Sequence, residues 1–344
     1  MKFAYTASQP RVVFGPGTRT ELCAELARLG AKRVLVISSP GQAQAAAALL
    51  PNAALYPHAV VHVPVAVADA ARAHADALGA DAYVAYGGGS AIGLAKAIAV
   101  ATGHPIVAMP TTYSGSEATP IYGLTDGGIK RTARDARAQP RTIIYDVELY
   151  AALPAKVAGP SGINAIAHSV EALYAVDGNP AIDALAESSV RALAHALPRL
   201  DDEREAAVAG AWLAGTCLAS VAMALHHKLC HALGGAFDLP HAETHAIVLP
   251  HALAYNAPAA PAAMAALRRA LGTDDPPGAL FDLRAALGAP GSLAELGVPR
   301  DGLARIAQQA VTAPYPNPRP LEQAPLLALL EAAFDGRRPT DTRA

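Results

Sequence analysis

Residues 82–101 read AYVAYGGGSAIGLAKAIAVA, and this stretch decides the fold of the N-terminal part of the chain. A short apolar run at residues 82–86 is followed by three glycines and Ser90, and then by an apolar stretch of helical composition. This order predicts a strand, a tight turn and a helix, as found in a β–α–β unit. The glycines let the backbone approach an anion, and the amides at the helix start can bind phosphate together with the Ser90 hydroxyl. A tight turn that binds no ligand is the alternative.

The same alternation continues on both sides of this stretch. Further strands are expected at residues 33–38, 60–63, 106–109 and 142–145, and helices at residues 18–29, 41–50 and 65–78. Such alternation is typical of a parallel sheet with helices on both faces. Beyond residue 153 alanine- and leucine-rich stretches predominate, and helices are expected at residues 163–174, 181–197, 205–225, 262–271 and 325–334. The sequence therefore predicts an α/β nucleotide-binding domain over residues 1–153 and an all-α domain over residues 154–344.

The composition excludes several classes of protein. Of the 344 residues, 52% are hydrophobic and 16% are charged, which excludes general disorder. The 27 basic and 29 acidic residues leave no basic excess, which a nucleic-acid binder held by general electrostatics needs. Three cysteines are too few for a disulfide scaffold or a cysteine-rich zinc site. Residues 1–10 do not resemble a signal peptide, and no apolar run reaches the ~18 residues of a membrane span, so we expect a soluble, cytoplasmic protein.

A second loop strengthens the interpretation of the glycine loop as a phosphate site. Residues 110–117 read PTTYSGSE and follow the next expected strand, at the end where open α/β sheets bind ligands. Two such loops favour a dinucleotide over a lone phosphate. The residues expected to contact the coenzyme are Gly88, Gly89, Ser90, Thr111, Thr112 and Ser114. Ser39 stands where an acidic residue would bind the ribose 2′-hydroxyl and repel a 2′-phosphate, so either NADH or NADPH is expected to fit.

Histidines are concentrated in the C-terminal part. Asn164 and His168 are four residues apart, as are His227 and His231, so each pair projects from one face of a helix. Two more histidines follow at His241 and His245. Histidines at this spacing indicate a metal or catalytic cluster, and histidines that only fill core or surface positions are the alternative.

These pieces, in this order, resemble the iron-containing (group III) alcohol dehydrogenase family, which shares its architecture with dehydroquinate synthase and glycerol dehydrogenase. The residues that carry the resemblance are Phe14-Gly15-Pro16-Gly17, the glycine loop with Gly93 and Lys96, residues 110–117, Asn164 with His168, residues 227–251, and Asn317-Pro318-Arg319-Pro320-Leu321. The resemblance implies a dehydroquinate synthase-like fold and hydride transfer from a nicotinamide in the cleft between its two domains. It also implies a metal held by an Asp and three His, at the positions of Asn164, His168, His227 and His241, with His231 facing the substrate.

Asn164 departs from this ligand pattern, because an amide replaces a carboxylate. The runs 120–132 and 241–246 resemble the branch of the family that reduces the carbon–carbon double bond of maleylacetate to 3-oxoadipate in the degradation of aromatic compounds. Such a conjugated acceptor needs a hydrogen-bond donor more than a Lewis acid. We therefore expect activity without a metal, with Asn164, His168, His227 and His241 as vestigial ligand positions. His231 or His241 is expected to supply the proton, within a catalytic cluster that includes His168, His227 and His245.

The two carboxylates of such a substrate require cationic or hydrogen-bonding partners. The candidates are Tyr113, Tyr122, Arg131, Arg134 and Asn164. Lys130 is a candidate as well, although the family resemblance implies that a lysine near this position contacts the coenzyme. We further expect a homodimer whose partner is a small dicarboxylate substrate and which binds neither nucleic acid nor membrane.

Three other functions stay open at this point. One is a metal-dependent alcohol or polyol dehydrogenase of the same family, which bound iron or zinc and alcohol oxidation would favour. Another is a lyase of the dehydroquinate synthase type, against which Asn164 and Ser39 weigh. The third is a binding protein without catalysis, against which the two loops and the histidines weigh.

Overall fold

A computed structural model describes residues 3–7, 10–127, 129–312 and 315–339, and for residues 129 and 130 it describes the backbone alone. The chain divides into two compact units. Ser8–Leu153 form the α/β unit, and Pro154–Ala344 form the helical unit together with Met1–Ala7. The expected α/β domain over residues 1–153 included this N-terminal segment, whereas the structure groups it with the helical unit.

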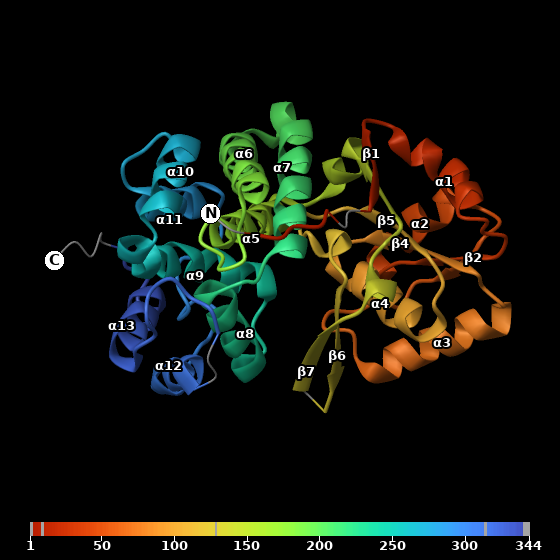
Figure 1. Ribbon diagram of the computed structural model, residues 1–344. Coiled ribbons are helices and arrows are strands. Elements are labelled where there is room, and N and C mark those ends of the chain that lie inside the picture. The colour runs from red at the N-terminus through yellow and green to blue at the C-terminus, as the bar shows by residue number, and fades with distance from the viewer. Residues whose placement is uncertain (1–2, 8–9, 128, 313–314, 340–344) are drawn as a thin grey trace. The chain divides into compact units, whose positions relative to one another are not determined.

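The α/β unit contains a six-stranded parallel sheet in the order β1-β8-β5-β4-β2-β3 (Figure 1). Its strands are β1 (Arg11–Gly15), β2 (Val34–Ile37), β3 (Ala54–Tyr56), β4 (Ala82–Gly87), β5 (Ile106–Pro110) and β8 (Thr142–Asp146). Its helices are α1 (Leu22–Arg28), α2 (Ala43–Leu49), α3 (Val65–Leu78) and α4 (Gly89–Thr102). The expected strand, glycine turn and helix at residues 82–101 are therefore confirmed.

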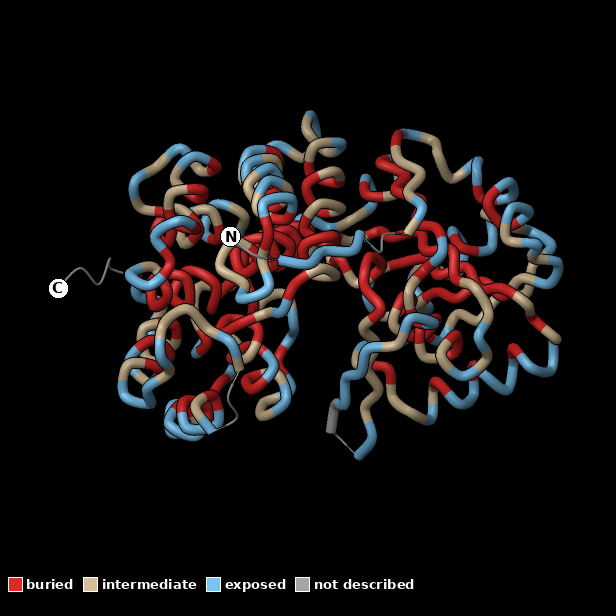
Figure 2. Tube along the Cα trace, viewed as in Figure 1, coloured by how far each residue is buried: buried red, intermediate tan, exposed pale blue. Residues whose placement is uncertain are grey.

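Alternate residues of the central strands enter two different cores, because successive side chains of a strand point to opposite faces of the sheet. Tyr83 and Ala85 pack with α3 and α4 on one face, whereas Val84 and Tyr86 pack with α1 and α2 on the other. Figure 2 shows the middle of the sheet as buried. Burial on both faces explains why β4 is continuously apolar.

The strand expected at residues 60–63 is wrong. His62 and Val63 have φ values of 63° and 44°, in the left-handed region, so the chain turns there. The turn is held by Thr125, whose amide donates to the Val63 carbonyl (3.1 Å) and whose hydroxyl donates to the His62 carbonyl (2.7 Å). Thr125 belongs to a hairpin that the sequence did not indicate, formed by β6 (Ile121–Asp126) and β7 (Ile129–Arg134) (Figure 1).

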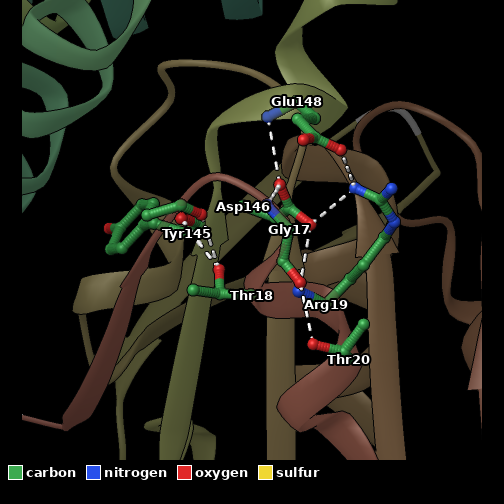
Figure 3. Close-up of polar contacts among 8 residues, drawn as sticks. Gly17, Thr18, Arg19, Thr20, Tyr145, Asp146 and Glu148 are labelled. Atoms are coloured by element: carbon green, nitrogen blue, oxygen red, sulfur yellow. Dashed lines mark hydrogen bonds and ion pairs between the residues drawn. The ribbon is translucent and has the colours of Figure 1, made fainter.

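Asp146, the last residue of β8, organises the loop that follows β1 (Figure 3). Its buried carboxylate accepts hydrogen bonds from the amides of Gly17 (3.0 Å), Arg19 (2.9 Å) and Glu148 (3.0 Å). The Arg19 guanidinium adds an ion pair at 2.8 Å. The Phe14-Gly15-Pro16-Gly17 motif is thereby tied to the carboxyl edge of the sheet.

The helical unit is built around α5 (Ala155–Ala172), which is buried from Ala158 onward. The other helices are α6 (Pro180–Ala196), α7 (Leu200–Ser220), α8 (Leu225–Phe237), α9 (His241–Asn256), α10 (Pro261–Leu271), α11 (Pro276–Ala286), α12 (Leu303–Thr312) and α13 (Gln323–Phe334). Among the described residues no single helix has the length and apolarity to cross a membrane, while the bent pair Pro180–Ser220 and Leu225–Phe237 meets those two criteria together.

The helix expected at residues 205–225 ends earlier, at Ser220, and a new helix begins at Leu225. Val221 is extended, and three amides at the start of α8 are bound by distant side chains. The Ala224 and His226 amides donate to Glu171, and the Leu225 amide donates to Asn317 Oδ1. These tertiary contacts satisfy the amides that a helix start leaves unpaired and so permit the break.

Candidate active site

The carboxyl ends of β2, β4 and β5 carry three loops that contact one another. Because these strands are parallel and adjacent, their carboxyl ends meet at one edge of the sheet. The Thr111 amide donates to the Gly87 carbonyl (3.2 Å), and the Gln42 side-chain amide donates to the Thr111 hydroxyl (2.9 Å). The Ser39 hydroxyl donates to Gln42 Oε1 (3.5 Å). The structure thus brings Ser39 and the two expected loops together, and it adds Gln42, which no sequence motif indicated.

The three glycines of the glycine loop are constrained differently. Gly87 has φ +138°, and a Cβ atom there would lie 2.5 Å from Gln42 Oε1. A Cβ atom on Gly88, the N-cap of α4, would lie 2.8 Å from a Thr112 methyl carbon. Around Gly89, the first residue of α4, the nearest atom to such a Cβ is 4.0 Å away. The positive φ therefore requires glycine at position 87 and the Thr112 side chain disfavours a Cβ at Gly88, whereas Gly89 leaves open the approach to the amides that start α4.

Two buried ionisable side chains, Lys96 and Glu117, lie at the end of the hydroxyl-rich loop, residues 110–117. Lys96 of α4 donates to the Thr119 hydroxyl (3.0 Å) and to the carbonyls of Ile121 (2.9 Å) and Ser116. Burial lowers the pKa of Lys96 to about 7. Glu117 accepts a hydrogen bond from the Tyr145 hydroxyl (2.9 Å), and burial raises its pKa. Lys96 therefore connects α4, which follows the glycine loop, to the end of the hydroxyl-rich loop.

The expected substrate contacts of the α/β unit differ in exposure. Tyr113 is buried and stacks on Tyr150, with ring centroids 5.2 Å apart. Tyr122 is half-buried on β6, whereas Arg131 and Arg134 are exposed on β7. The Lys130 side chain lies outside the described residues. The remaining expected coenzyme contacts are the half-buried Ser90, Thr112 and Ser114. The roles of all these residues stay predictions.

The helical unit brings all five expected histidines together. His168 comes from α5, His227 and His231 from α8, and His241 and His245 from α9. The rings of His168 and His227 stack with centroids 5.1 Å apart, and those of His241 and His245 are 4.2 Å apart. His245 also lies 4.8 Å from His227 and so links the two pairs. We call these five residues, with His226, the imidazole cluster.

The imidazole cluster runs from the interior to the surface. His168, His227 and His245 are buried, whereas His231 and His241 are exposed. Burial, followed by the neighbouring imidazoles, lowers the pKa of His168 and of His245 well below the usual value. Both rings are therefore neutral at pH 7, which is the state in which an imidazole binds a metal.

Several buried polar atoms of the imidazole cluster and its neighbour Asn164 have no hydrogen-bond partner among the described residues. They are Asn164 Oδ1, His168 Nδ1, His227 Nε2 and His245 Nε2. In addition, His231, His241 and His245 each offer a nitrogen, and these three atoms lie within 4.8 Å of one another. Buried polar groups without a partner are rare in proteins and call for an ion or another ligand. The residues present therefore fit a bound cation.

Sequence reasoning missed two members of the site. His226 Nε2 lies 2.9 Å from His245 Nδ1 and so orients that ring, and His226, Cys230 and His245 form a second possible metal group. The adjacency of His226 to His227 was the available signal. Glu171 lies 2.6 Å from His227 Nδ1, and its position three residues after His168 placed it on the same face of the helix.

Comparisons with known proteins agree with this architecture. The family profile described as iron-containing alcohol dehydrogenase matches residues 9–147, and the profile for the C-terminal part of the Fe-containing alcohol dehydrogenase family matches residues 159–334. The chain is 52% identical to the maleylacetate reductase of Burkholderia cepacia in an alignment of 349 positions that covers 98% of this chain and 99% of that protein. The maleylacetate reductase of Sphingobium indicum is 50% identical over 350 aligned positions, which cover 98% of this chain and 99% of that protein. The crystal structure of maleylacetate reductase from Agrobacterium tumefaciens is similar at a TM-score of 0.94 and 46% identity, and the match covers 98% of this chain and 100% of that one.

These matches correct the expectation that no metal is bound. Both profiles describe an iron-containing family, and three nitrogens of the imidazole cluster lie close enough together to bind one ion. The expectation was wrong because it rested on the loss of one carboxylate at Asn164 and on a conjugated substrate for which a metal is dispensable, and neither removes the imidazoles that can hold an ion. Three imidazoles can hold a divalent ion without that carboxylate.

Proposed function

The chain belongs to the iron-containing alcohol dehydrogenase family, and from that membership we propose that it reduces the carbon–carbon double bond of maleylacetate to 3-oxoadipate with a nicotinamide coenzyme. The observation that carries this proposal is identity of about half over 98% of the chain with maleylacetate reductases. An alcohol or polyol dehydrogenase of the same family is not better supported.

We assign the coenzyme to the carboxyl edge of the sheet in the α/β unit. The amides at the start of α4, with the Ser90 hydroxyl, would bind the pyrophosphate, because helix N-termini attract anions. Thr111, Thr112 and Ser114 would contact the rest of the dinucleotide. Gln42 contacts both Ser39 and Thr111 and is therefore a further candidate beside the adenosine ribose.

Replacing Gly89 with Val should raise the coenzyme KM sharply. The new side chain has space within the protein, since the nearest atom to its Cβ is 4.0 Å away, but it would occupy the approach to the amides of α4. The melting temperature should therefore stay close to that of the parent, and coenzyme titration in steady-state kinetics measures the effect. Gly88→Ala is the structural control, since its Cβ would lie 2.8 Å from Thr112 and should lower the melting temperature. An unchanged coenzyme KM in folded Gly89→Val would contradict the assignment.

In the reaction, hydride from the reduced coenzyme adds to the carbon of the double bond that is β to the ketone. The electron pair of the carbon–carbon double bond forms a new double bond between the α carbon and the ketone carbon, and the carbonyl pair moves onto the ketone oxygen to give an enolate. A proton then adds to the α carbon as the ketone forms again. His231 or His241, the exposed members of the imidazole cluster, would donate a hydrogen bond to the developing oxyanion and deliver the proton, and His231 would do so where His241 holds a cation.

A divalent cation, when bound, supplies Lewis-acid stabilisation of negative charge on oxygen. The residues that would hold it are His168, His227, His241 and His245. His227 and His245 are favoured because their Nε2 atoms are buried without a partner, and His241 because it shares a ligand group with His245. Asn164 Oδ1 is an additional unpaired oxygen that could accept either the cation or a substrate group.

The test is a spectrophotometric assay of NADH and NADPH oxidation in the presence of maleylacetate. We expect both coenzymes to be oxidised, because Ser39 presents no charge that would repel a 2′-phosphate. The product should be 3-oxoadipate, heavier than the substrate by two hydrogens in mass spectrometry. Reduction of NAD⁺ by an alcohol or polyol, without oxidation of NADH by maleylacetate, would instead identify the alternative.

We further propose that the protein acts in the cytoplasm as a homodimer. The cytoplasmic location is supported by Cys23, Cys217 and Cys230, which form no disulfide. Size-exclusion chromatography with light scattering measures the assembly.

A further inference from the structure

Glu171 is a fully buried carboxylate at the centre of the helical unit, and no step proposed above uses it. Oε1 accepts the His226 amide (2.8 Å), and Oε2 accepts the Ala224 amide (3.0 Å) and faces His227 Nδ1 at 2.6 Å. One carboxylate of α5 therefore caps α8 and contacts a ring of the imidazole cluster. Ala224, the N-cap residue itself, provides no side-chain cap.

The contact with Glu171 determines which nitrogen of His227 carries the proton. Both oxygens of Glu171 accept backbone amides, so the carboxylate is the acceptor, Nδ1 is the donor, and Nε2 is the nitrogen that remains for another partner. That Nε2 atom is buried and has no hydrogen-bond partner among the described residues. The ring is also held in place by stacking against His168. The His227 ring is thus held in one orientation, with its Nε2 atom buried and unpaired.

The charge of Glu171 is only partly balanced by the protein. Among the described residues its single salt-bridge partner is His227, and its other partners are backbone amides. The N-terminus of α8 offers a partial positive charge, but a buried carboxylate normally has a full cationic partner. A cation on Nε2, at the opposite side of the same ring, would supply it.

We propose that Glu171 is a positioning residue that orients His227 for a divalent cation and supplies the negative charge that Asn164 does not. The inference rests on the metal site of the proposed function. It explains how a ligand set without its carboxylate can retain affinity, because a carboxylate hydrogen-bonded to a metal-binding imidazole raises the basicity of that ring. The negative charge would thus lie on Glu171, which does not touch the ion and acts on it through the His227 ring.

The experiment measures cation binding and not turnover. Chelator-treated protein is titrated with Zn²⁺ or Co²⁺ in competition with a chromophoric chelator. Glu171→Gln should weaken binding by ~10–100-fold, the usual cost of removing such an outer partner. Adding Asn164→Asp to Glu171→Gln should restore most of the affinity, because it returns the charge beside the same ion. A structural defect alone would not be repaired by a carboxylate at position 164.

Glu25→Gln is the matched control. Glu25 is also buried and also has three hydrogen-bond partners, in its case the side chains of Arg11, Arg28 and Thr142, but it lies in the α/β unit. Its replacement should destabilise the protein and leave cation affinity unchanged. The proposal is overturned if Glu171→Gln binds the ion like the parent, if Glu25→Gln loses as much affinity, or if Asn164→Asp restores none.

A second measurement needs no variant. The ¹⁵N shifts of the His227 ring in the metal-free parent should report a proton on Nδ1 and none on Nε2. A proton on Nε2 would contradict the proposal even if Glu171→Gln failed to fold. Neither readout depends on maleylacetate, so failure of the proposed reaction and failure of this inference are separate results.

Discussion

His241→Ala and His231→Ala are each expected to lower kcat by ~10²–10⁴-fold, the usual cost of removing a positioned proton donor, while the coenzyme KM changes little. Both rings are at the exposed side of the imidazole cluster, where a substrate can reach them. They stack on each other with centroids 6.0 Å apart, and both face the buried His245. Steady-state kinetics with maleylacetate and saturating NADH measures the effect.

Two controls make this result specific. His195→Ala removes an exposed histidine of α6, outside the imidazole cluster, and should retain parental turnover. Metal content is measured for each variant, because His231 and His241 belong to a possible ligand group and loss of the ion must be distinguished from loss of the donor. Near-normal turnover in both alanine variants would remove acid catalysis from this cluster.

Asp146→Ala is expected to reduce the free energy of unfolding by about 3 kcal/mol, as for the loss of one partner of a buried ion pair. Three backbone amides lose their acceptor, and so does the Arg19 guanidinium (Figure 3). The estimate is at the lower end of the range because Arg19 is 38% exposed and water can replace part of its interaction. Urea denaturation followed by circular dichroism measures the change.

Glu148→Ala is the control for this prediction. Glu148 also pairs with Arg19, at 2.6 Å, but its side chain is 53% exposed. Its loss should cost less than about 1 kcal/mol, as for surface ion pairs. Equal destabilisation by the two substitutions would show that the Arg19 pairing, and not the buried carboxylate of Asp146, stabilises the loop after β1.

Local patterns in the sequence were enough for the α/β framework. β4 is apolar at every position because both of its faces are covered, and the run of glycines at its end marks the turn into α4. The histidine spacing likewise identified the imidazole cluster, since residues four apart share a face of a helix. Val60 and Val61 show the limit of such patterns, because β-branched residues there stand before a left-handed turn held by Thr125.

Only the tertiary structure decided the break between α7 and α8 and the state of the imidazole cluster. Nothing local marks the end of α7 at Ser220, because the carboxylate that caps α8 belongs to Glu171, 53 and 55 positions before the amides it accepts. The same long-range contact assigns the proton of His227 and leaves its Nε2 unpaired. Asn164 and the conjugated substrate together led us to expect a protein without a metal, since sequence spacing does not reveal which buried atoms lack a partner. The periodicity of a sequence predicts which face of a helix or strand a residue occupies. The residue that it contacts across that face depends on how segments distant in the chain pack together.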